Sequence, residues 1–271
     1  MNEQNAEYLK ERLFYLGFGD KLHAELEKNI RQQSEQFKLP IQAEFSKGGQ
    51  KDVVDFSLDF SKSKQSDMYF LNSYQASLKN DDPEKERSQT FYINKGNGVT
   101  AKEAYNLLDG RAVHKKLSDK EGNPYEAWLQ LNFDQKEENG SNKVQKYHTA
   151  WGYDLEKALD RHPVKESANP DQRKDLIKSL EKGNIQQVTF QRDGQDEKMF
   201  LEANPKERNL IVYDSQMARQ FQGIKEHKGE KTEIKEGQGQ SEDSGQKKKA
   251  EKAVDDPDAP AKKSRKKGMS A

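Results

Sequence analysis

The sequence predicts an α+β protein of helix-plus-antiparallel-meander units, with a disordered C-terminal tail. First, segments with apolar residues at helical spacing are followed by several strand-like segments in a row. Helices and strands therefore do not alternate one by one, which favours antiparallel sheets. Second, a capped helix followed by glycine and a hairpin occupies Val99–Phe133, and a looser copy begins at Asn169, which suggests a duplicated unit. Third, the chain beyond residue 221 is almost free of apolar residues and cannot bury enough surface to fold.

Residues 1–97 are predicted to form a helical pair followed by antiparallel strands. Apolar residues recur at helical spacing from Asn5 to Phe37, with an interruption at Gly17–Gly19. We expect Asp20 to cap the second helix and Pro40 to end the helical region. Apolar–polar alternation then predicts strands at 41–45, 54–60, 68–78 and 90–94.

The first unit of residues 98–221 begins with Thr100 and Glu103, which have the spacing of a capping box. Gly110 ends the helix, and a hairpin follows. One strand face carries residues that are expected to point inward: Tyr125, Ala127, Leu129, Leu131 and Phe133. The other face is polar except for Trp128. The simplest hairpin register places His114 opposite Trp128 and Lys116 opposite Glu126.

The second unit repeats this order. Asn169 and Pro170 mark a helix start, Gly183 marks its end, and residues 192–195 read as a hairpin turn. The segment Trp128–Asn132 aligns with Phe200–Asn204, so each unit places one aromatic residue on an otherwise polar face. We expect a final strand at residues 210–213.

Composition indicates a protein with an economical core, because 35% of the 271 residues are charged and 31% are hydrophobic. The formal net charge is zero, so overall charge indicates neither nucleic-acid nor membrane binding. The absence of cysteine excludes disulfides, thiolate metal sites and thiol catalysis. The N-terminus does not have the order of a signal peptide, and no apolar run is long enough to span a bilayer. We therefore expect a cytoplasmic protein without membrane contact.

Several segments resemble an uncharacterised family of bacterial proteins, found in Bacteroidetes-type genomes and often alongside mobile or conjugative elements. The segments are Tyr8–Gly19, Asp67–Ser73, Asn94–Gly96, Gly110–Val113 and Glu202–Pro205. The resemblance covers about residues 5–221. It implies a context of DNA mobility and supplies no catalytic residues.

No motif indicates an enzyme, a cofactor or a metal site. The glycine-rich segment 95–98 lacks the Walker and Rossmann patterns, so we interpret it as a turn that precedes a helix. The five histidines, at positions 23, 114, 148, 162 and 227, do not have the spacing of a helical metal site. The carboxylate pairs Asp81–Asp82 and Asp255–Asp256 lie in polar segments, where no pocket is expected to raise a pKa.

Two candidate binding regions follow. Aromatic residues on polar faces can stack on bases or anchor a partner, so Trp128 and Phe200, with His114 and Lys116, could form a shallow platform. Alternatively, these residues form surface cross-strand pairs, or another element covers the tryptophan. The tail ends in a basic cluster that would attract phosphates, bind an acidic partner or only maintain solubility: Lys262, Lys263, Arg265, Lys266 and Lys267.

The leading hypothesis is a non-enzymatic accessory or binding protein that contacts nucleic acid or a nucleic-acid-handling complex. The first alternative is a protein–protein interaction module without nucleic-acid contact. The second is an enzyme with a dispersed active site. A pocket that joins His114 or His148 to carboxylates would favour the enzyme, exposed aromatic residues beside lysines would favour nucleic acid, and a large apolar patch would favour a protein partner.

Overall fold

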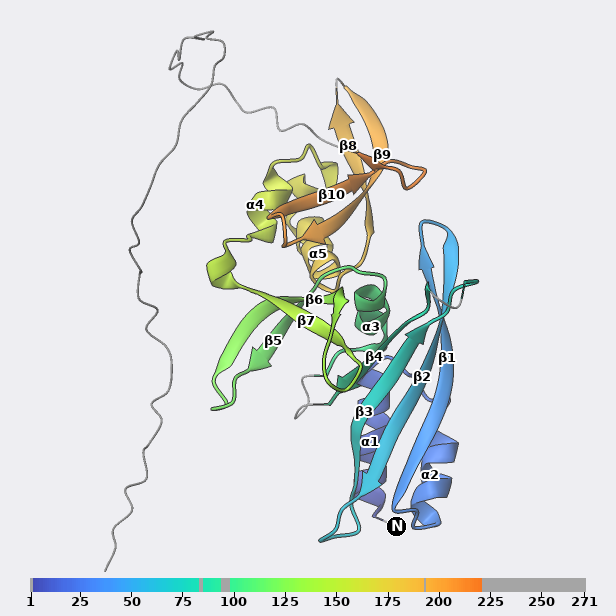
Figure 1. The fold of residues 1–271 in the computed structure, drawn as a ribbon. Coiled ribbons are helices and arrows are strands. Elements are labelled where there is room, and N and C mark those ends of the chain that lie inside the picture. Colours follow the sequence, from blue (N-terminus) through green and yellow to red (C-terminus); the bar gives the residue numbers. More distant parts are fainter. Residues whose placement is uncertain (1, 83–84, 94–97, 193, 221–271) are drawn as a thin grey trace, which may run out of the picture. The chain divides into compact units, whose positions relative to one another are not determined.

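The computed structural model describes residues 2–82, 85–93, 98–192 and 194–220, which belong to one compact unit, 1–223. The described part contains helices and three antiparallel sheets, which confirms the α+β class (Figure 1). The tail expected at residues 222–271, with Lys262, Lys263, Arg265, Lys266 and Lys267, lies outside the described residues. Positions 95–97 of the glycine-rich segment also lie outside them.

The elements alternate between short helical segments and meanders. The helices are α1 (Glu3–Tyr15), α2 (His23–Arg31), α3 (Ala101–Leu108), α4 (Leu155–Asp160) and α5 (Pro170–Glu181), with short 3-10 turns at Thr149–Trp151 and Lys165–Ala168. The strands are β1 (Gln36–Lys47), β2 (Gln50–Lys62), β3 (Tyr69–Leu78), β4 (Arg87–Tyr92), β5 (Val113–Ser118), β6 (Pro124–Lys136), β7 (Asn142–His148), β8 (Gln186–Arg192), β9 (Gln195–Asn204), β10 (Asn209–Tyr213) and β11 (Arg219–Gln220).

The first sheet has the order β1-β2-β3-β4, and the helices α1, α2 and α3 contribute to its core. The alternation predicted for β2 is confirmed: Val54, Phe56, Leu58 and Phe60 are at most 2% exposed. The β1–β2 connection is a two-residue turn at Gly48–Gly49, both with positive φ, as a tight hairpin requires.

Three predictions for the segment from Asp20 to Pro40 were wrong. The second helix ends at Arg31, and Phe37 belongs to β1. Pro40 does not end a helix but pairs with Ser57 inside β1, because β1 is an edge strand and can accommodate a residue without an N–H. Asp20 does not cap α2 with its side chain; its backbone carbonyl accepts a hydrogen bond from the N–H of His23.

The capping box at α3 is confirmed, since Thr100 accepts from the N–H of Glu103 and the Glu103 carboxylate accepts from the N–H of Thr100. Gly110 follows the helix with a φ of +93°. The predicted hairpin register is also correct: His114 pairs with Trp128, and Lys116 pairs with Glu126.

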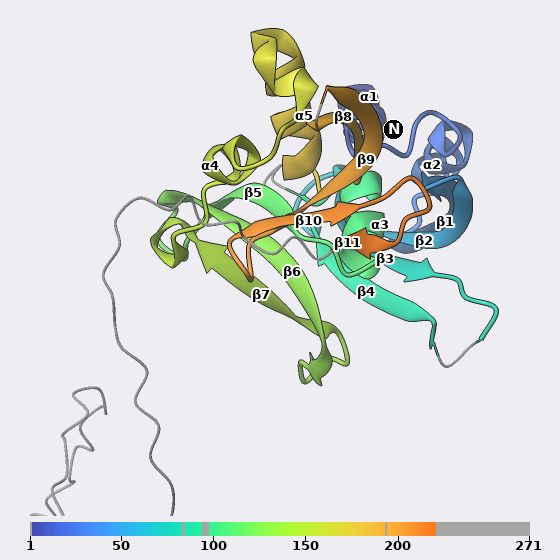
Figure 2. The ribbon, with the colours of Figure 1, turned by 90° about the horizontal axis from the view of Figure 1, so that it is seen from above.

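The sheet β5-β6-β7, which Figure 2 shows from above, contributes residues to two hydrophobic clusters. Leu129 and Leu131 belong to the first hydrophobic cluster, which also holds the residues of β1–β4 and α1–α3. Trp128 and Tyr147 belong to a second cluster, with α4, α5 and the strands β8–β10. Trp128, on the face that is otherwise polar, therefore lies in a hydrophobic core.

The second unit follows the predicted order. The side chain of Asn169 caps α5 at Pro170, Gly183 follows the helix with a φ of +76°, and Arg192 pairs with Gln195 across the turn. Strands β8–β11 form the sheet β11-β10-β9-β8. Each unit is thus a helix, a glycine and an antiparallel meander, and the aligned aromatic residues occupy comparable positions: Trp128 pairs with Tyr147, and Phe200 pairs with Tyr213.

Candidate functional site

The aromatic platform expected at Trp128 is absent, because this side chain is only 6% exposed. Its ring centroid lies 5.2 Å from that of His114 and 5.3 Å from that of Tyr153. Tyr153 immediately precedes α4 and packs against the second cluster, so an element later in the chain covers the polar face of β6. The structure thus agrees with the alternative in which the tryptophan is covered.

Phe200 does not extend such a platform either. It is half-buried on β9, between Gln187 of β8 and Tyr213 of β10, and therefore lies in a different sheet from Trp128. The two aligned aromatic residues occupy corresponding places in two meanders and do not share one surface.

The other two predicted residues, His114 and Lys116, line a cleft of about 410 Å³, which we call the basic cleft. It is formed by the end of α1, the start of α3, the strand β5 and the end of α5. Its lining is rich in cationic side chains: Arg12, Lys115, Lys116, Lys178 and Lys182, with Glu103, His114, Glu181, Tyr15, Leu16, Gly98 and Thr100 completing the wall.

Local structure explains how two of these charges are held. Lys115 Nζ lies 3.0 Å from Glu103 Oε2, and Glu103 is fixed because it closes the capping box of α3. Lys116 Nζ lies 3.3 Å from Oε1 of Glu126, its cross-strand partner on β6. The Lys116 side chain is 84% exposed, so solvent weakens its pair with Glu126, whereas the Lys115 side chain is only 16% exposed.

Three cations of the basic cleft have no acidic partner among the residues that the structure describes: Arg12, Lys178 and Lys182. The Nη2 atom of Arg12 is also buried and has no hydrogen-bond partner among the described residues. Lys178 and Lys182 are exposed and lie one helical turn apart on α5. These groups leave an uncompensated positive charge in the cleft.

A larger cavity of about 600 Å³ provides a contrast, because its cations are mostly compensated. Lys47 pairs with Asp109, Lys79 with Glu86, and Lys85 with Asp82. Arg87 donates to the carbonyl of Leu108, and Lys136 donates to the side chain of Asn142. Each of the two cavities is therefore lined by five lysines and arginines, of which three pair with a carboxylate here and two do so in the basic cleft.

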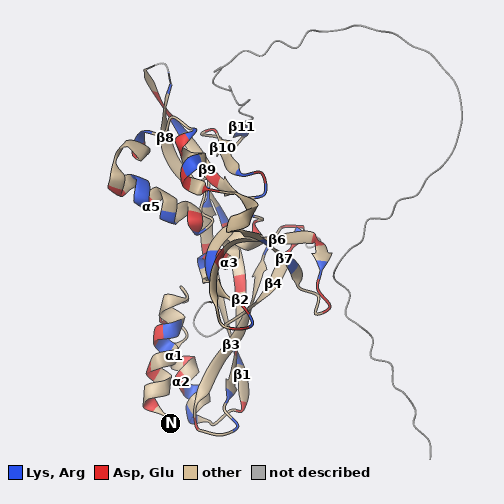
Figure 3. Ribbon diagram, turned by 90° about the vertical axis from the view of Figure 1, so that its left-hand side faces the viewer, with Lys and Arg blue, Asp and Glu red and all other residues tan. Residues whose placement is uncertain are grey.

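An exposed aromatic residue borders the same cleft. Tyr15, at the end of α1, is 73% exposed, and the ring of the 65% exposed Phe14 lies against it at 6.0 Å. Basic and acidic residues are interleaved along α5, which explains why its sequence gives no obvious basic patch (Figure 3). Sequence reasoning missed Arg12, Tyr15, Lys178 and Lys182; the i, i+4 spacing of the two lysines was the one local signal.

A second, smaller cavity of about 220 Å³ shares His114 and Glu181 with the basic cleft but has the opposite charge. We call it the aromatic–acidic pocket. Its aromatic walls are Trp128, Tyr147 and Tyr153, its carboxylates are Glu126, Asp154, Glu156 and Glu181, and its histidines are His114 and His148. Burial raises the pKa of Tyr153, so this phenol is neutral at physiological pH.

The aromatic–acidic pocket has the composition that sequence analysis associated with an enzyme, since two histidines meet carboxylates. His114 lies between Glu126, at 3.9 Å from Nε2, and Glu181, at 3.6 Å from Nδ1. The ring of His148 lies 5.4 Å from that of Tyr125. Within the described residues, neither histidine forms a hydrogen bond with a hydroxyl group that could act as a nucleophile.

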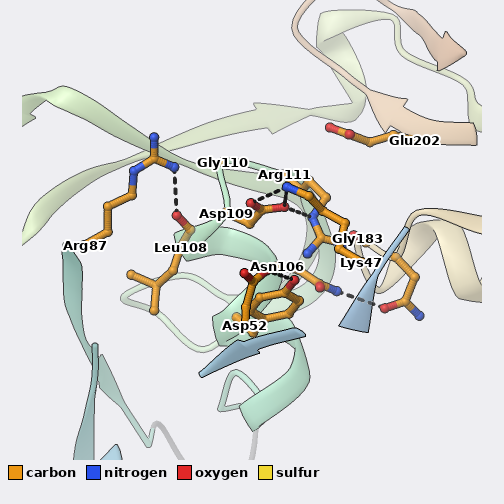
Figure 4. Close-up of polar contacts among 12 residues, drawn as sticks. Lys47, Asp52, Arg87, Asn106, Leu108, Asp109, Gly110, Arg111, Gly183 and Glu202 are labelled. Carbon is orange, nitrogen blue, oxygen red and sulfur yellow. Dashed lines mark hydrogen bonds and ion pairs between the residues drawn. The ribbon is translucent and has the colours of Figure 1, made fainter. Parts of the chain in front are cut away.

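A buried ionic group lies beside these cavities and holds the two units together (Figure 4). Asp109 Oδ1 lies 2.7 Å from Lys47 Nζ, and its Oδ2 lies 2.9 Å from Arg111 Nε. Arg111 is 4% exposed and donates to the carbonyl of Gly183. Burial, with Arg111 nearby, lowers the pKa of Lys102 to about 8. Lys47 and Asp109 line the cavity of about 600 Å³, but an ion pair holds each of them, so we interpret this group as structural.

The described residues lack two other features that would indicate a function. They contain no group of three or more His, Asp or Glu residues that could hold a metal ion. They also contain no helix with the length and apolar character needed to cross a bilayer. Comparison of the chain with protein-family models, curated proteins and solved structures finds no match.

Proposed function

We propose that the protein binds single-stranded nucleic acid without modifying it, with the phosphate backbone in the basic cleft. The observation that carries this proposal is the set of uncompensated cations, Arg12, Lys178 and Lys182, in a cleft bordered by the exposed Tyr15. Cations in a groove attract phosphates, and an exposed aromatic ring can stack on a base. The resemblance to proteins encoded near mobile elements agrees with a role as an accessory of DNA handling.

A single strand fits the site better than a duplex for a geometric reason. The cleft volume of about 410 Å³ lies within the range of small-ligand pockets, which suits about one nucleotide, with the flanking backbone outside the cleft. Base stacking on Tyr15 requires an unpaired base, because the faces of paired bases are covered by their neighbours. The proposed contacts are to phosphates and to the face of a base and not to base edges, so we expect no preference for a base sequence.

The test is fluorescence anisotropy with labelled single-stranded DNA, single-stranded RNA and duplex DNA over a salt series. We expect Lys178→Ala/Lys182→Ala to weaken single-strand binding by about tenfold or more, and to flatten the salt slope by about 1.4, since each lost phosphate contact removes about 0.7. Tyr15→Ala should weaken binding with little change in the salt slope, because stacking releases no counterions.

The matched control is Lys174→Ala/Lys206→Ala. This variant also loses two exposed lysines, one of them on α5, but neither lines the cleft. If both double variants lose affinity equally, binding follows total charge and the cleft is not the site. If no single-stranded probe binds the wild type at low salt, the proposed function is wrong and a protein partner becomes the better hypothesis.

Binding by the basic tail is a separate part of the proposal, since those residues lie outside the described part of the chain. Replacing Lys262, Lys263, Arg265, Lys266 and Lys267 with glutamine removes their charge without shortening the chain. If the tail contributes, this variant has lower affinity and a shallower salt slope than the wild type. A change that adds to that of the cleft variant would indicate that the two segments contribute independently.

An acid–base enzyme is the second candidate, favoured by the meeting of His114 and His148 with carboxylates in one pocket. Because His114 also lines the basic cleft, the substrate would be the phosphodiester of a bound strand. Incubation with end-labelled RNA and DNA tests this. Cleavage that is lost in His148→Ala at unchanged binding, and is lost in His114→Ala as well, would establish the enzyme; intact strands would exclude it for these substrates.

A further inference from the structure

We propose that the aromatic–acidic pocket is a binding site for an alkylammonium group. The proposal concerns a ligand of opposite charge to that of the basic cleft and does not depend on nucleic-acid binding. It rests on the combination of a small cavity, three aromatic walls and four carboxylates. An acidic surface alone would not select an organic cation, whereas aromatic rings attract the cation and its methylene groups together.

The charge of the pocket favours a cation. Four carboxylates, Glu126, Asp154, Glu156 and Glu181, reach its lining, and no lysine or arginine side chain lines it among the described residues. Three of the carboxylates pair with cations outside the pocket: Glu126 with Lys116, at 3.3 Å, Asp154 with Lys157, at 3.2 Å, and Glu156 with Arg173, at 3.7 Å. Asp154 accepts from the N–H of Lys157, which fixes its carboxylate at the start of α4.

The aromatic walls face more than one direction. The planes of Trp128 and Tyr153 meet at 64°, with centroids 5.3 Å apart. Tyr147 pairs with Trp128 across β6 and β7 and is 7% exposed. Rings inclined in this way surround a compact cation better than one flat ring does. The rings are already fixed by the second hydrophobic cluster, so binding requires little ordering of side chains.

The size of the pocket limits the ligand to one ammonium group with a short alkyl stem. A volume of about 220 Å³ is below the usual range for whole drug-sized ligands, so a longer molecule would insert one end only. Two sources share this chemistry: one end of a free polyamine, and the side chain of a lysine in a partner. The experiment must separate these sources from each other and from general ionic effects.

The fluorescence of Trp128 provides the readout. The chain has two tryptophans, and Trp151 does not line the pocket, so Trp151→Phe in the full-length protein leaves a single reporter inside the site. This variant is titrated with spermidine and with Nα-acetyl-lysine amide, at constant ionic strength. Nα-acetyl-norleucine amide has a similar stem without the charge and serves as the neutral comparison.

We expect a saturable change in Trp128 emission with at least one ammonium probe and none with the norleucine amide. Stronger binding of spermidine would indicate a free polyamine, and stronger binding of the lysine amide would indicate a partner side chain. In the reporter background, Glu126→Gln/Asp154→Asn should weaken binding at least fivefold, because it removes two pocket charges while asparagine still caps α4.

The matched control is Glu137→Gln/Glu138→Gln, which removes two exposed carboxylates from the β6–β7 turn. It should bind as the reporter protein does. The proposal is overturned if neither ammonium probe gives a saturable change, if the neutral amide gives the same change, or if the two double variants bind equally well. Failure here leaves the nucleic-acid proposal untouched, because the anisotropy experiment reads a different site.

Discussion

Arg111 Nη1 donates a hydrogen bond of 3.0 Å to the carbonyl of Gly183, so the glycine that ends α5 is fixed by the residue that follows α3. A parallel contact joins Asn106 of α3 to the carbonyl of Lys182, at 2.6 Å. The ends of the two unit helices are therefore held against each other by side chain–backbone bonds. Since the basic cleft uses both α3 and α5, these contacts position its walls.

Gly183→Ala is expected to destabilise the protein strongly. A Cβ atom at this position would lie 2.7 Å from the carbonyl oxygen of Ala112 and 2.9 Å from a methyl group of Val113. The left-handed φ of +76° adds strain, which costs about 1–2 kcal/mol for a residue with a side chain. Urea denaturation of the variant measures the total loss.

Gly140→Ala is the control for strain alone. Its φ of +80° is similar, but no atom lies within 4 Å of an added Cβ. We expect this variant to lose about 1–2 kcal/mol, and Gly183→Ala to lose clearly more. Equal losses would show that α5 can shift away from Ala112 without cost, and that the helix ends are not tightly held.

The ion pair between Asp109 and Arg111 should show strong coupling in a double-mutant cycle. The side chains are 14% and 4% exposed, so each single variant leaves a buried charge without its partner. We expect Asp109→Asn and Arg111→Met each to cost about 3–5 kcal/mol. Asp109→Asn should cost more, because Lys47 also loses its counterion.

The double variant Asp109→Asn/Arg111→Met should lose less than the sum of the single variants. A coupling of about 0.5–3 kcal/mol is typical of residues in direct contact. Denaturant unfolding of the four proteins gives this value. If the loss in the free energy of unfolding of the double variant equals the sum of the two single losses, water reaches the pair and the group does not hold the units together.

Trp128→Ala should unfold or strongly destabilise the protein and should not act as a binding variant. Removal of a core tryptophan costs about 3–5 kcal/mol, and this ring packs in the second cluster. Phe200→Ala should cost less, because Phe200 is half-buried. Thermal unfolding compares the two. A wild-type transition in Trp128→Ala, with reduced nucleic-acid binding, would restore the platform hypothesis.

Local sequence signals predicted the parts of the fold that depend on neighbours in the chain. Thr100 and Glu103 lie three residues apart, and their capping box formed as expected. The pairing of His114 with Trp128 followed from the length of one turn. The assignment of Phe37 to a helix failed because its apolar spacing fits a helix, whereas tertiary pairing with Phe60 on β2 decides for a strand.

The candidate sites depended on contacts that no local signal encodes. Trp128 looked exposed because alternation on β6 describes one strand, while the residue that covers it, Tyr153, comes after β7. The basic cleft joins Arg12 on α1 to Lys178 on α5, two helices at opposite ends of the described chain. The net charge of the whole chain is zero and gives no indication of such a cleft, because acidic residues elsewhere balance its cations.

Glu202 should make the stability of the protein fall as the pH rises from acid to neutral. Burial raises the pKa of this carboxyl above its ordinary value of 4.5, and the hydrogen bond from the Tyr213 hydroxyl, at 2.7 Å, opposes the rise. Between the unfolded and the folded pKa, the folded state binds more protons than the unfolded state. The free energy of unfolding contributed by Glu202 therefore decreases across that window and stays low above it.

Glu202→Gln removes this titration and keeps a hydrogen-bond acceptor for Tyr213. We expect the variant to be more stable than the wild type at neutral pH, and the difference to shrink as the pH falls below the folded pKa of Glu202. Urea unfolding of both proteins across the acid range measures the difference. Tyr213→Phe should change stability in the opposite direction at neutral pH, since the ionised carboxylate then loses its donor. A Glu202→Gln variant that is less stable at neutral pH would show that Arg111 and Lys47 compensate the buried charge more than its desolvation costs.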